Sequence, residues 1–398
     1  MGINLKNISN PYSVLALSWC IGLILYSLGW SEVFPIISYK LSIFIVSLCI
    51  LFFLVGCIFN IRFKNNWSNY SLNKQYHKSL LILDIILYVP NFFYSGIPLL
   101  SGERNLEFGI PTLIVICTTL NSFTSIYCYY LFLITGKKKF ILYSVLCLCI
   151  FILVFSRGNI VMTGISMFFL WINLKQPKLN LRKVLIFLTA TVLFMYLFGV
   201  AGNYRTINEV NSRVNNFDNS YNSNIILDVG EASDIFREKV LPGEFFWSYI
   251  YITSPLSNLQ YNINKYSPSL TGSGMIQLFI DEVLFDTISK RLDIILNFKP
   301  KKPDLIVEAL TVPTTFAESY IYAGWWGMIF LSFVLLLFPL LYVLCVANNP
   351  LGIIGISILC TSYFFSIFDN MLILTGLMSQ IFFPIILFVI NKIDFNKI

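Results

Sequence analysis

The sequence predicts an all-α, polytopic integral membrane protein with about ten transmembrane helices and one large loop outside the membrane. The chain of 398 residues is 57% hydrophobic and only 12% charged, whereas soluble domains are about 25% charged. Apolar runs of about 20 residues recur along it, and such runs are long enough to cross a bilayer as helices. The charges gather in residues 202–313, which hold 10 of the 27 Lys and Arg residues and 13 of the 20 Asp and Glu residues.

The apolar segments divide the chain into seven helices in residues 1–201, a polar module at 202–315 and three helices in 316–398. Alternate short joints and the two termini carry fourteen Lys and Arg residues, and the other short joints carry only Lys40, Arg104 and Arg157. Positive joints remain in the cytoplasm, so both termini are predicted to be cytoplasmic and the polar module external. The ten helices are predicted at 12–30, 41–59, 80–99, 110–134, 140–155, 159–173, 184–201, 316–345, 352–368 and 371–391.

The polar module is predicted to contain interfacial elements rather than further spans. Residues 203–225 are rich in Asn and Ser and are predicted to be irregular. Residues 241–266 are aromatic but interrupted at Pro255, which favours a segment lying in the membrane interface. Residues 275–298 have helical periodicity and predict one amphipathic helix along the membrane or the bundle. Its apolar side contains Ile276, Phe279, Ile280, Val283, Ile288, Leu292 and Ile295, and its polar side contains Gln277, Asp281, Asp286, Lys290, Asp293 and Asn297.

Composition excludes several classes of function. The net charge of +7 comes from the short joints, while the module is slightly acidic, so a nucleic-acid partner is not expected. None of the nine cysteines falls in residues 202–313, so no disulfide framework is expected there. The only histidine, His77, lies in a cytoplasmic joint, so no His/Cys metal site and no cofactor are expected.

Arg157 is a candidate functional residue because of the space around it. Two helices and a turn fit between Lys139 and Lys175, which leaves about 17 residues, or about 26 Å, for each helix. The hydrocarbon layer is about 30 Å thick, so the turn at Ser156–Asn159 is predicted at or just below the outer interface. An arginine there faces a partner or a wet cavity; alternatively, it extends to lipid phosphate.

Glu318 opens the eighth helix at its outer end, in the run Ala317-Glu318-Ser319-Tyr320 that precedes Gly324 and Gly327. A carboxylate near a helix N-terminus is stabilised by the helix dipole, and burial would raise its pKa. Glu318 is therefore either a solvated residue of the first turn or a base or ligand for a polar substrate. The two glycines permit close helix packing.

Several cations are predicted on the outer face above apolar and aromatic surface. Arginine side chains match phosphate oxygens two at a time, and aromatic rings stack on sugars. Such a surface suits a ligand with a charged head, sugars and a long lipid tail. The outer cations are Arg157, Arg205, Arg213, Arg237, Lys290 and Arg291.

The chain resembles the O-antigen and oligosaccharide repeat-unit polymerases, the Wzy-type family. The resemblance covers the overall plan of many helices with one large late periplasmic loop. Three short matches occur in order: Phe155-Ser156-Arg157-Gly158, then Gly202-Asn203-Tyr204-Arg205, then Ala317-Glu318-Ser319-Tyr320 with Gly324 and Gly327. Some members of the family have an Arg followed by a Gly sixteen residues later. In this chain Gly230 follows Arg213 by one residue too many, so this motif is not assigned here.

The resemblance implies a GT-C-like glycosyltransferase in the bacterial inner membrane, with the loop in the periplasm. It would move a growing glycan from undecaprenyl diphosphate to the next lipid-linked repeat unit, without a metal or cofactor. Glu318 is the first candidate for the catalytic base and Glu244 the second. A chain-length regulator would be a possible protein partner. The residues expected to bind diphosphate or substrate are Arg157, Arg205, Arg291, Arg213, Arg237 and Tyr320.

Three other readings compete with a polymerase. An O-antigen ligase shares the plan and the donor, but that family uses a periplasmic histidine, and His77 is predicted to be cytoplasmic. A lipid-linked oligosaccharide flippase or other transporter would place binding groups near the bilayer midplane, often in inverted repeats. No such repeat is seen, and the only charge well inside a predicted helix, Asp84, lies near a cytoplasmic end. A structural membrane component without catalysis should tolerate substitution of Arg157 and Arg205.

Overall fold

The computed structural model describes residues 3–4, 8–62, 75–101, 108–213, 225–238, 241–308, 310–347 and 349–395. Within these ranges the side chains at 3–4, 61–62, 101, 179, 205–213, 225 and 393–395 lie outside the description. The described chain is almost entirely helical, and its one sheet pairs the two-residue strands β1 (Ile3–Asn4) and β2 (Lys178–Leu179). The prediction of a helical membrane protein is therefore confirmed.

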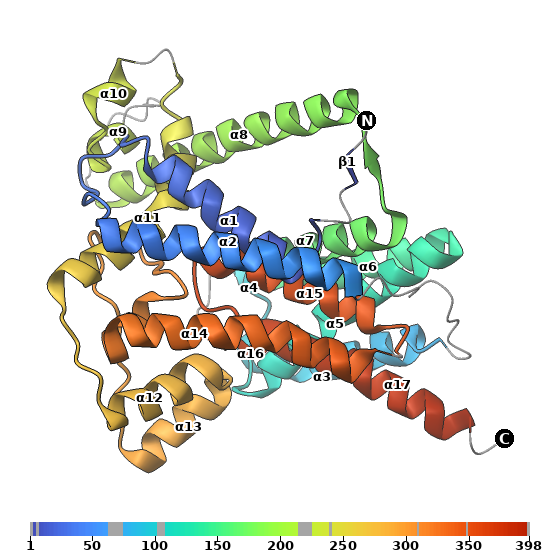
Figure 1. Cartoon of the computed structure of the whole chain (residues 1–398). Coiled ribbons are helices and arrows are strands. Elements are labelled where there is room, and N and C mark those ends of the chain that lie inside the picture. The colour runs from blue at the N-terminus through green and yellow to red at the C-terminus, as the bar shows by residue number, and fades with distance from the viewer. Residues whose placement is uncertain are drawn as a thin grey trace.

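The long helices form one bundle with a group of shorter helices at one end (Figure 1). The bundle contains α1 (Pro11–Tyr26), α2 (Tyr39–Arg62), α3 (His77–Ser95), α4 (Pro98–Ser101), α5 (Leu113–Thr135), α6 (Lys138–Leu153), α7 (Arg157–Lys175), α8 (Leu181–Arg213), α14 (Ala317–Val346), α15 (Gly352–Phe364), η3 (Phe365–Ile367), α16 (Thr375–Met378), η4 (Ser379–Ile381) and α17 (Phe382–Phe395). The shorter group contains α9 (Ile225–Val229), α10 (Asp234–Arg237), α11 (Phe245–Lys265), α12 (Gly272–Val283) and α13 (Asp286–Leu296).

Six helices in the described ranges are long and apolar enough to cross a membrane. Two shorter apolar helices, at Pro11–Tyr26 and Gly352–Ile367, accompany them. Each of the ten predicted segments overlaps a helix of the bundle, but the count of ten spans stays a prediction. The six spans are Tyr39–Asn60, His77–Ser95, Leu113–Thr135, Leu181–Tyr204, Ala317–Val346 and Thr375–Lys392.

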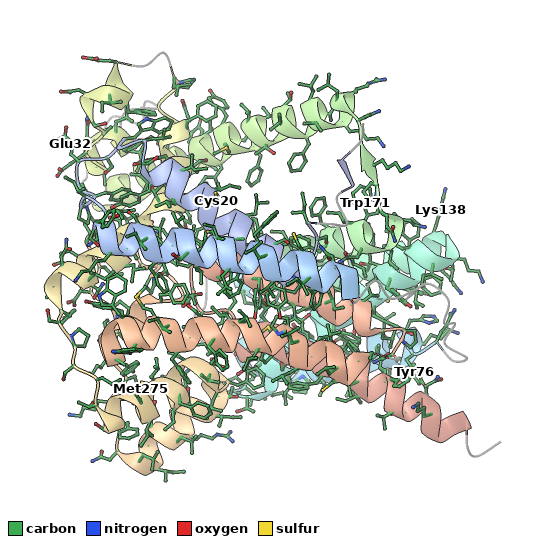
Figure 2. The ribbon with its side chains drawn as sticks, in the orientation of Figure 1. Cys20, Glu32, Tyr76, Lys138, Trp171 and Met275 are labelled. Carbon is green, nitrogen blue, oxygen red and sulfur yellow. The ribbon has the colours of Figure 1, made fainter. Side chains whose placement is uncertain are left out.

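The bundle has two distinct ends, which we call the strand end, with β1 and β2, and the module end, with α9–α13 (Figure 1). At the strand end, the Tyr130 hydroxyl donates to the carbonyl of Pro350 at 3.3 Å, which joins α5 to the turn after α14. At the module end, the Trp30 amide donates to the Tyr249 hydroxyl at 3.0 Å, which joins the turn after α1 to α11. Alternate joints therefore meet at opposite ends, as a polytopic bundle requires. Figure 2 labels Tyr76 and Lys138 at the strand end and Glu32 and Met275 at the module end.

Two segments of the polar module are more regular than the sequence indicates. Helix α8 continues to Arg213, although residues 203–213 were predicted to be irregular. Gly202 and Asn203 lie against Trp247 of α11, whose indole Nε1 donates to Asn203 Oδ1 at 2.7 Å. This packing extends the helix past its apolar part, because Asn and Ser each lower helix stability by only about 0.7 kcal/mol or less.

Helix α11 is one continuous helix, so the predicted interruption at Pro255 is wrong. A proline inside a helix removes a single backbone hydrogen bond and can be accommodated when the helix is well packed. Two-thirds of the helix is buried, including Pro255 and its neighbours, which places it inside the molecule against α1, α8 and α14. Its aromatic side chains therefore form a protein core, with Trp30, Phe236 and Tyr249 in contact.

The amphipathic segment at 275–298 consists of two helices, α12 and α13, and not one. Leu284 has an extended backbone, which ends the first helix. In α12 the carboxyl side chains of Asp281 and Glu282 are buried, while Ile276 and Phe279 are about half exposed. The polar side thus packs on the protein, and the apolar side faces outward, as expected for helices bordering lipid.

The last predicted helix, 371–391, is also subdivided. The chain forms the short helix α16 and a 3-10 turn, η4, before α17 begins at Phe382. The segment before α16 therefore has an irregular backbone and can present side chains and amides to α12 and α13. These contacts form part of the candidate site.

Candidate functional site

Helix α14 is broken near the module end, and its two glycines cause the break. Ala323 and Gly324 have non-helical backbones, and Gly324 has φ +61° and ψ −142°, a region that L side chains rarely adopt. A Cβ on Gly327 would lie 2.0 Å from the carbonyl oxygen of Ser319. The first two turns of α14 therefore form a separate element that carries Glu318. The glycines that were predicted to serve helix packing instead fold α14 back on itself.

The break brings Glu318 against a second, fully buried carboxyl group, Glu282 at the end of α12. The Glu282 side chain is 1% exposed and faces the Glu318 carboxyl. Asn370 Nδ2 donates to Glu282 Oε2 at 2.9 Å. Burial, followed by the negative charge of Glu318, raises the pKa of Glu282 well above its usual range. A negative charge this close disfavours ionisation, so Glu282 retains its proton more readily than an ordinary glutamate.

Asp281, the neighbour of Glu282, belongs to a second polar contact with α13 and α14. The Tyr322 hydroxyl donates to Asp281 Oδ2 at 2.5 Å and accepts from the Lys301 amide at 2.8 Å. Burial raises the pKa of Asp281 to about 6, with the charges of Asp293 and Glu318 adding to it and the Tyr322 hydrogen bond opposing it. The carboxyl side chains of α12 are thus held by α14 on one side and α13 on the other.

Asp369 adds a fifth carboxyl from the segment that follows η3. Trp19 Nε1 donates to Ser366 Oγ at 3.0 Å, and the Thr315 hydroxyl donates to the Asp369 carbonyl at 2.8 Å, so both ends of this segment are fixed. Burial raises the pKa of Asp369 to about 6. We call Asp281, Glu282, Asp293, Glu318 and Asp369 the carboxyl cluster. Among the described residues, no three His, Cys, Asp or Glu side chains are placed to hold a metal ion.

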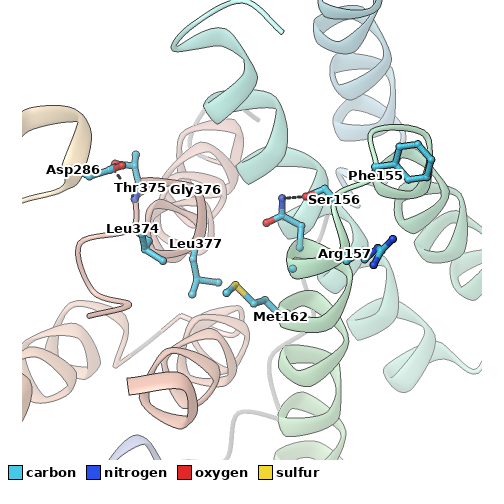
Figure 3. A pocket seen from close by; sticks show the side chains of 11 residues that line it. Phe155, Ser156, Arg157, Met162, Asp286, Leu374, Thr375, Gly376 and Leu377 are labelled. Atoms are coloured by element: carbon cyan, nitrogen blue, oxygen red, sulfur yellow. Dashed lines mark hydrogen bonds between the residues drawn. The ribbon is translucent and has the colours of Figure 1, made fainter. Parts of the chain in front are cut away.

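A cavity of about 390 Å³ lies between the start of α7, Asp286 of α13 and the segment 374–377, and none of the five cluster carboxyls lines it. Asp286 Oδ1 accepts from the Thr375 amide at 3.1 Å, and Lys290 Nζ lies 3.5 Å from Asp286 Oδ2. Arg157, the first residue of α7, lines the opposite wall and is exposed. Figure 3 shows the Arg157 side chain extending away from Asp286 and Thr375. The cavity is lined by Phe155, Ser156, Arg157, Gly158, Asn159, Met162, Asp286, Leu374, Thr375, Gly376 and Leu377.

The predicted arginines do not all meet at this cavity. Arg157 lines it, whereas Arg291, on α13 one residue after Lys290, is exposed and does not. Arg237 is held structurally by α9 and α10, because its Nε donates to the Ala232 carbonyl at 2.9 Å and an Nη donates to Asp228 at 2.9 Å. Arg205 and Arg213 belong to the backbone of α8, and their side chains lie outside the described residues.

The remaining predicted residues have different surroundings. Glu244 is buried where α8 crosses α11, and a Cβ on Gly199 would lie 2.0 Å from its carbonyl oxygen. Tyr320 is buried next to Glu318, and its hydroxyl donates to the Tyr266 carbonyl at 3.2 Å. Tyr320 thus fixes the first turn of α14 to the end of α11.

Sequence reasoning did not single out Glu282, Asp286 or Asp369 as site residues. A usable signal was present, since Asp281 and Glu282 are adjacent acids in a strongly amphipathic helix. Asp369 also stands alone between two apolar runs. Charged residues in such contexts are seldom solvated, and they need a partner. The partner is set by the fold, because Glu282 and Glu318 are 36 positions apart in the chain.

Comparison of the chain with protein-family models, curated proteins and solved structures gives no match. The function is therefore argued from the carboxyl cluster, the cavity and the membrane bundle. The cavity and the carboxyl cluster both include residues of α13, Asp286 and Asp293, and so both lie at the module end.

The raised carboxyl pKa values predict that the protein is more stable in acid than in base. A carboxyl whose folded pKa is raised contributes stability that is complete below its ordinary pKa of about 4 and is lost as pH rises through the folded value. That loss spans about pH 4 to 6 for Asp281 and Asp369 and extends higher for Glu282. We expect the Tm in detergent to fall by several degrees between about pH 5 and about pH 8.

Glu282→Gln should reduce this fall, since the amide keeps the shape of the acid but cannot ionise. The matched control is Glu308→Gln, at an exposed glutamate outside the carboxyl cluster, which should leave the pH dependence unchanged. Thermal unfolding of the three proteins across pH makes the comparison. An identical pH profile for Glu282→Gln and the unsubstituted protein would show that the Glu282 carboxyl does not titrate in this range.

Proposed function

We propose that the chain is a metal-independent glycosyltransferase that polymerises polyprenyl-diphosphate-linked oligosaccharide repeat units into a surface polysaccharide. The observation that carries the proposal is the carboxyl pair Glu282–Glu318 at the end of a membrane bundle that also holds a cavity lined by Arg157. A carboxylate held against a buried carboxyl group is suited to general base catalysis. A cationic side chain at the same end of the bundle is suited to a phosphorylated substrate.

The lipid carrier is supported by a second, apolar groove of about 290 Å³ between α2 and α14. The groove begins at Phe44, which packs against Phe316 and Trp325 around the start of α14. It extends along α14 to Leu336, away from the carboxyl cluster. A polyprenyl tail lying in this groove would have its head group near Glu318. Contact with the apolar side chains of the groove would stabilise the bound tail.

The proposed reaction is a single exchange at the anomeric carbon of the donor glycan. The bond from this carbon to the diphosphate oxygen breaks, and a bond from the same carbon to an acceptor hydroxyl forms. The acceptor proton passes to the Glu318 carboxylate, and the polyprenyl diphosphate leaves with the electron pair of the broken bond. Arg157 and Lys290 would stabilise the charge that develops on the leaving phosphate. Asp286 accepts from Thr375 and contacts Lys290, which limits its repulsion of that phosphate.

The same proposal gives the orientation in the membrane. The positive joints and both ends of the chain would face the cytoplasm of a bacterial inner membrane, and the module end would face the periplasm. Undecaprenyl-diphosphate oligosaccharides would be the substrates, and a chain-length regulator would be a protein partner.

Deletion of the gene followed by electrophoresis of the surface polysaccharide tests this function. Loss of a polymerase leaves the lipid core carrying one repeat unit, whereas loss of a ligase or a flippase leaves a core with none. We expect the first pattern. Complementation with Arg157→Ala should restore less than about one-hundredth of the polymer, because a cation that stabilises developing charge contributes about 10²-fold.

The control for Arg157→Ala is Arg182→Ala, at another exposed arginine at the other end of the bundle, at the start of α8. It should restore normal polymer. A core without any repeat unit in the deletion strain would exclude a polymerase, and normal polymer with Arg157→Ala would remove Arg157 from the mechanism.

Of the other candidates, a transporter is favoured by a specific observation, the polar side chains on the buried face of α3. An O-antigen ligase is less favoured. His77, the only histidine, begins α3 at the strand end, far along the bundle from the carboxyl cluster (Figure 1).

A further inference from the structure

Helix α3 is inverted relative to an ordinary amphipathic helix, because its polar residues face the protein interior within the bundle. Its buried residues are His77, Leu80, Asp84, Tyr88 and Asn91, which recur every three or four positions and form one face. We call His77, Asp84, Tyr88 and Asn91 the polar stripe of α3. It extends over fourteen positions, or about 21 Å, which is most of the hydrocarbon thickness.

After Lys78 and Ser79 in its first turn, the outward side of α3 is apolar, as expected for a helix that contacts lipid. Its exposed large side chains are Ile82, Leu83, Ile85, Ile86, Val89, Phe93 and Tyr94. Water therefore cannot reach the polar stripe from this side. Among the described residues α3 packs chiefly against α5, and His77 also contacts Phe140 and Tyr143 of α6.

Within the stripe Asn91 is satisfied, but Asp84 is not. Asn91 is fully used, since its Nδ2 donates to the Leu87 carbonyl at 2.9 Å and its Oδ1 accepts from the Ile110 amide at 2.8 Å. Asp84 is 1% exposed, and neither of its carboxyl oxygens has a hydrogen-bond partner among the described residues. A buried carboxylate in this condition is strongly unfavourable.

The groups around Asp84 carry no positive charge. Thr124 of α5 faces the carboxyl, and its hydroxyl completes no hydrogen bond within the described residues. One turn earlier on α5, Asn121 uses its Nδ2 on the Cys147 carbonyl at 3.0 Å, while its Oδ1 has no partner there. The uncommitted donor that these two residues offer is the Thr124 hydroxyl, which is neutral. The missing component is a positive charge.

No such charge is supplied by the neighbouring helices. The titratable groups that interact electrically with Asp84 are Tyr88 on α3, Cys117 and Cys128 on α5, and Cys147 on α6. All four are neutral at neutral pH. Among the described residues, none of the ion pairs includes Asp84. The one residue of the stripe that can carry a positive charge is His77, two turns away at the strand end, whose two ring nitrogens also have no hydrogen-bond partner among the described residues.

We propose that Asp84 is a reversible proton-binding site inside the membrane, formed with Thr124 and Asn121 on the buried side of α3. A bound proton removes the buried charge and makes one carboxyl oxygen a hydrogen-bond donor. A proton needs only one carboxyl oxygen, whereas a sodium ion would need a full shell of oxygen ligands. The site is separate from the carboxyl cluster and does not depend on the proposed glycosyl transfer.

Labelling with dicyclohexylcarbodiimide tests this site, because the reagent enters lipid and reacts with protonated carboxyls in apolar surroundings. The full chain, purified into lipid bilayers, is labelled and analysed peptide by peptide by mass spectrometry. We expect Asp84 to be labelled at about pH 6 and at least about fivefold less at about pH 9, with recovery when the pH is returned. Labelling should be equal in sodium chloride and choline chloride.

Two variants make the test specific. Asp84→Asn should remove the label from this peptide while the Tm stays close to that of the unsubstituted protein, because the amide resembles the neutral acid. Thr124→Val removes the only facing hydroxyl and should extend labelling to higher pH. Absence of label at Asp84, or equal labelling at both pH values, would overturn the proposal. Protection by sodium but not by choline would also overturn it, in favour of a sodium site.

Discussion

Glu318→Gln is expected to abolish polymer growth without changing the amount of protein in the membrane. The amide has the size of the acid, but it cannot accept the proton of the acceptor hydroxyl, and a general base contributes about 10²–10⁴-fold to rate. Glu318 is only partly buried and lies in the first turn of α14, so the substitution leaves the packing of the break intact. Polymer length on gels and transfer by the purified protein, with Glu308→Gln as control, measure the effect.

Substitution of the neighbouring carboxyl, Glu282, provides a second test of the same mechanism. If Glu282 stays protonated and Glu318 acts as the base, Glu282→Gln imitates the protonated acid and should keep a substantial part of the activity. Equal loss in both variants would mean that the pair acts only as a unit. Polymer of normal length with Glu318→Gln would eliminate this residue as the base.

The break in α14 should be the position most sensitive to a single added methyl group. Gly327→Ala places a Cβ 2.0 Å from the Ser319 carbonyl oxygen, a backbone atom that cannot rotate away. Gly324→Ala forces a side chain into a backbone region that costs about 1–3 kcal/mol. We expect Gly327→Ala to lower the Tm strongly and to eliminate activity, because the turn carrying Glu318 must move away from Glu282.

A matched substitution separates this effect from a general intolerance of alanine. Gly164 lies inside α7 with nothing within 4 Å of an added Cβ, so Gly164→Ala should be neutral or should stabilise by up to about 1 kcal/mol. The Tm in detergent and polymer length are measured for both. Unchanged Tm and activity in Gly327→Ala would show that α14 is a continuous helix in the membrane.

Hydropathy predicted the positions of the bundle helices because burial in lipid acts on each segment separately. A run of about 20 apolar residues must satisfy its own backbone as a helix, whatever its neighbours are. The same reasoning failed at 203–213, at Pro255 and within 275–298. In the module, the extent of a helix depends on packing against other segments and not on local composition. Helix α8, for example, continues past Asn203, which accepts a hydrogen bond from Trp247.

The candidate site was only partly accessible to the sequence. Glu318 was found because a carboxylate at the end of an apolar run is unusual, and Arg157 because a short hairpin forces it toward the interface. The grouping of the arginines was not predictable, since Arg237 is used by the carbonyl of Ala232 and the carboxylate of Asp228. The position of Asp286 in the cavity depends on a contact with Thr375, 89 residues later.

The sequence by itself determined that this chain is a helical membrane protein with a polar module at one end, because each apolar run carries its own reason to be a helix. Only the tertiary structure decided which carboxyls meet. Glu282 joins Glu318 through the break at Gly324, and Asp84 faces Thr124 through the packing of α3 on α5. Whether a carboxyl group is buried depends on side chains from several segments of the chain. The sequence of one segment therefore could not predict it.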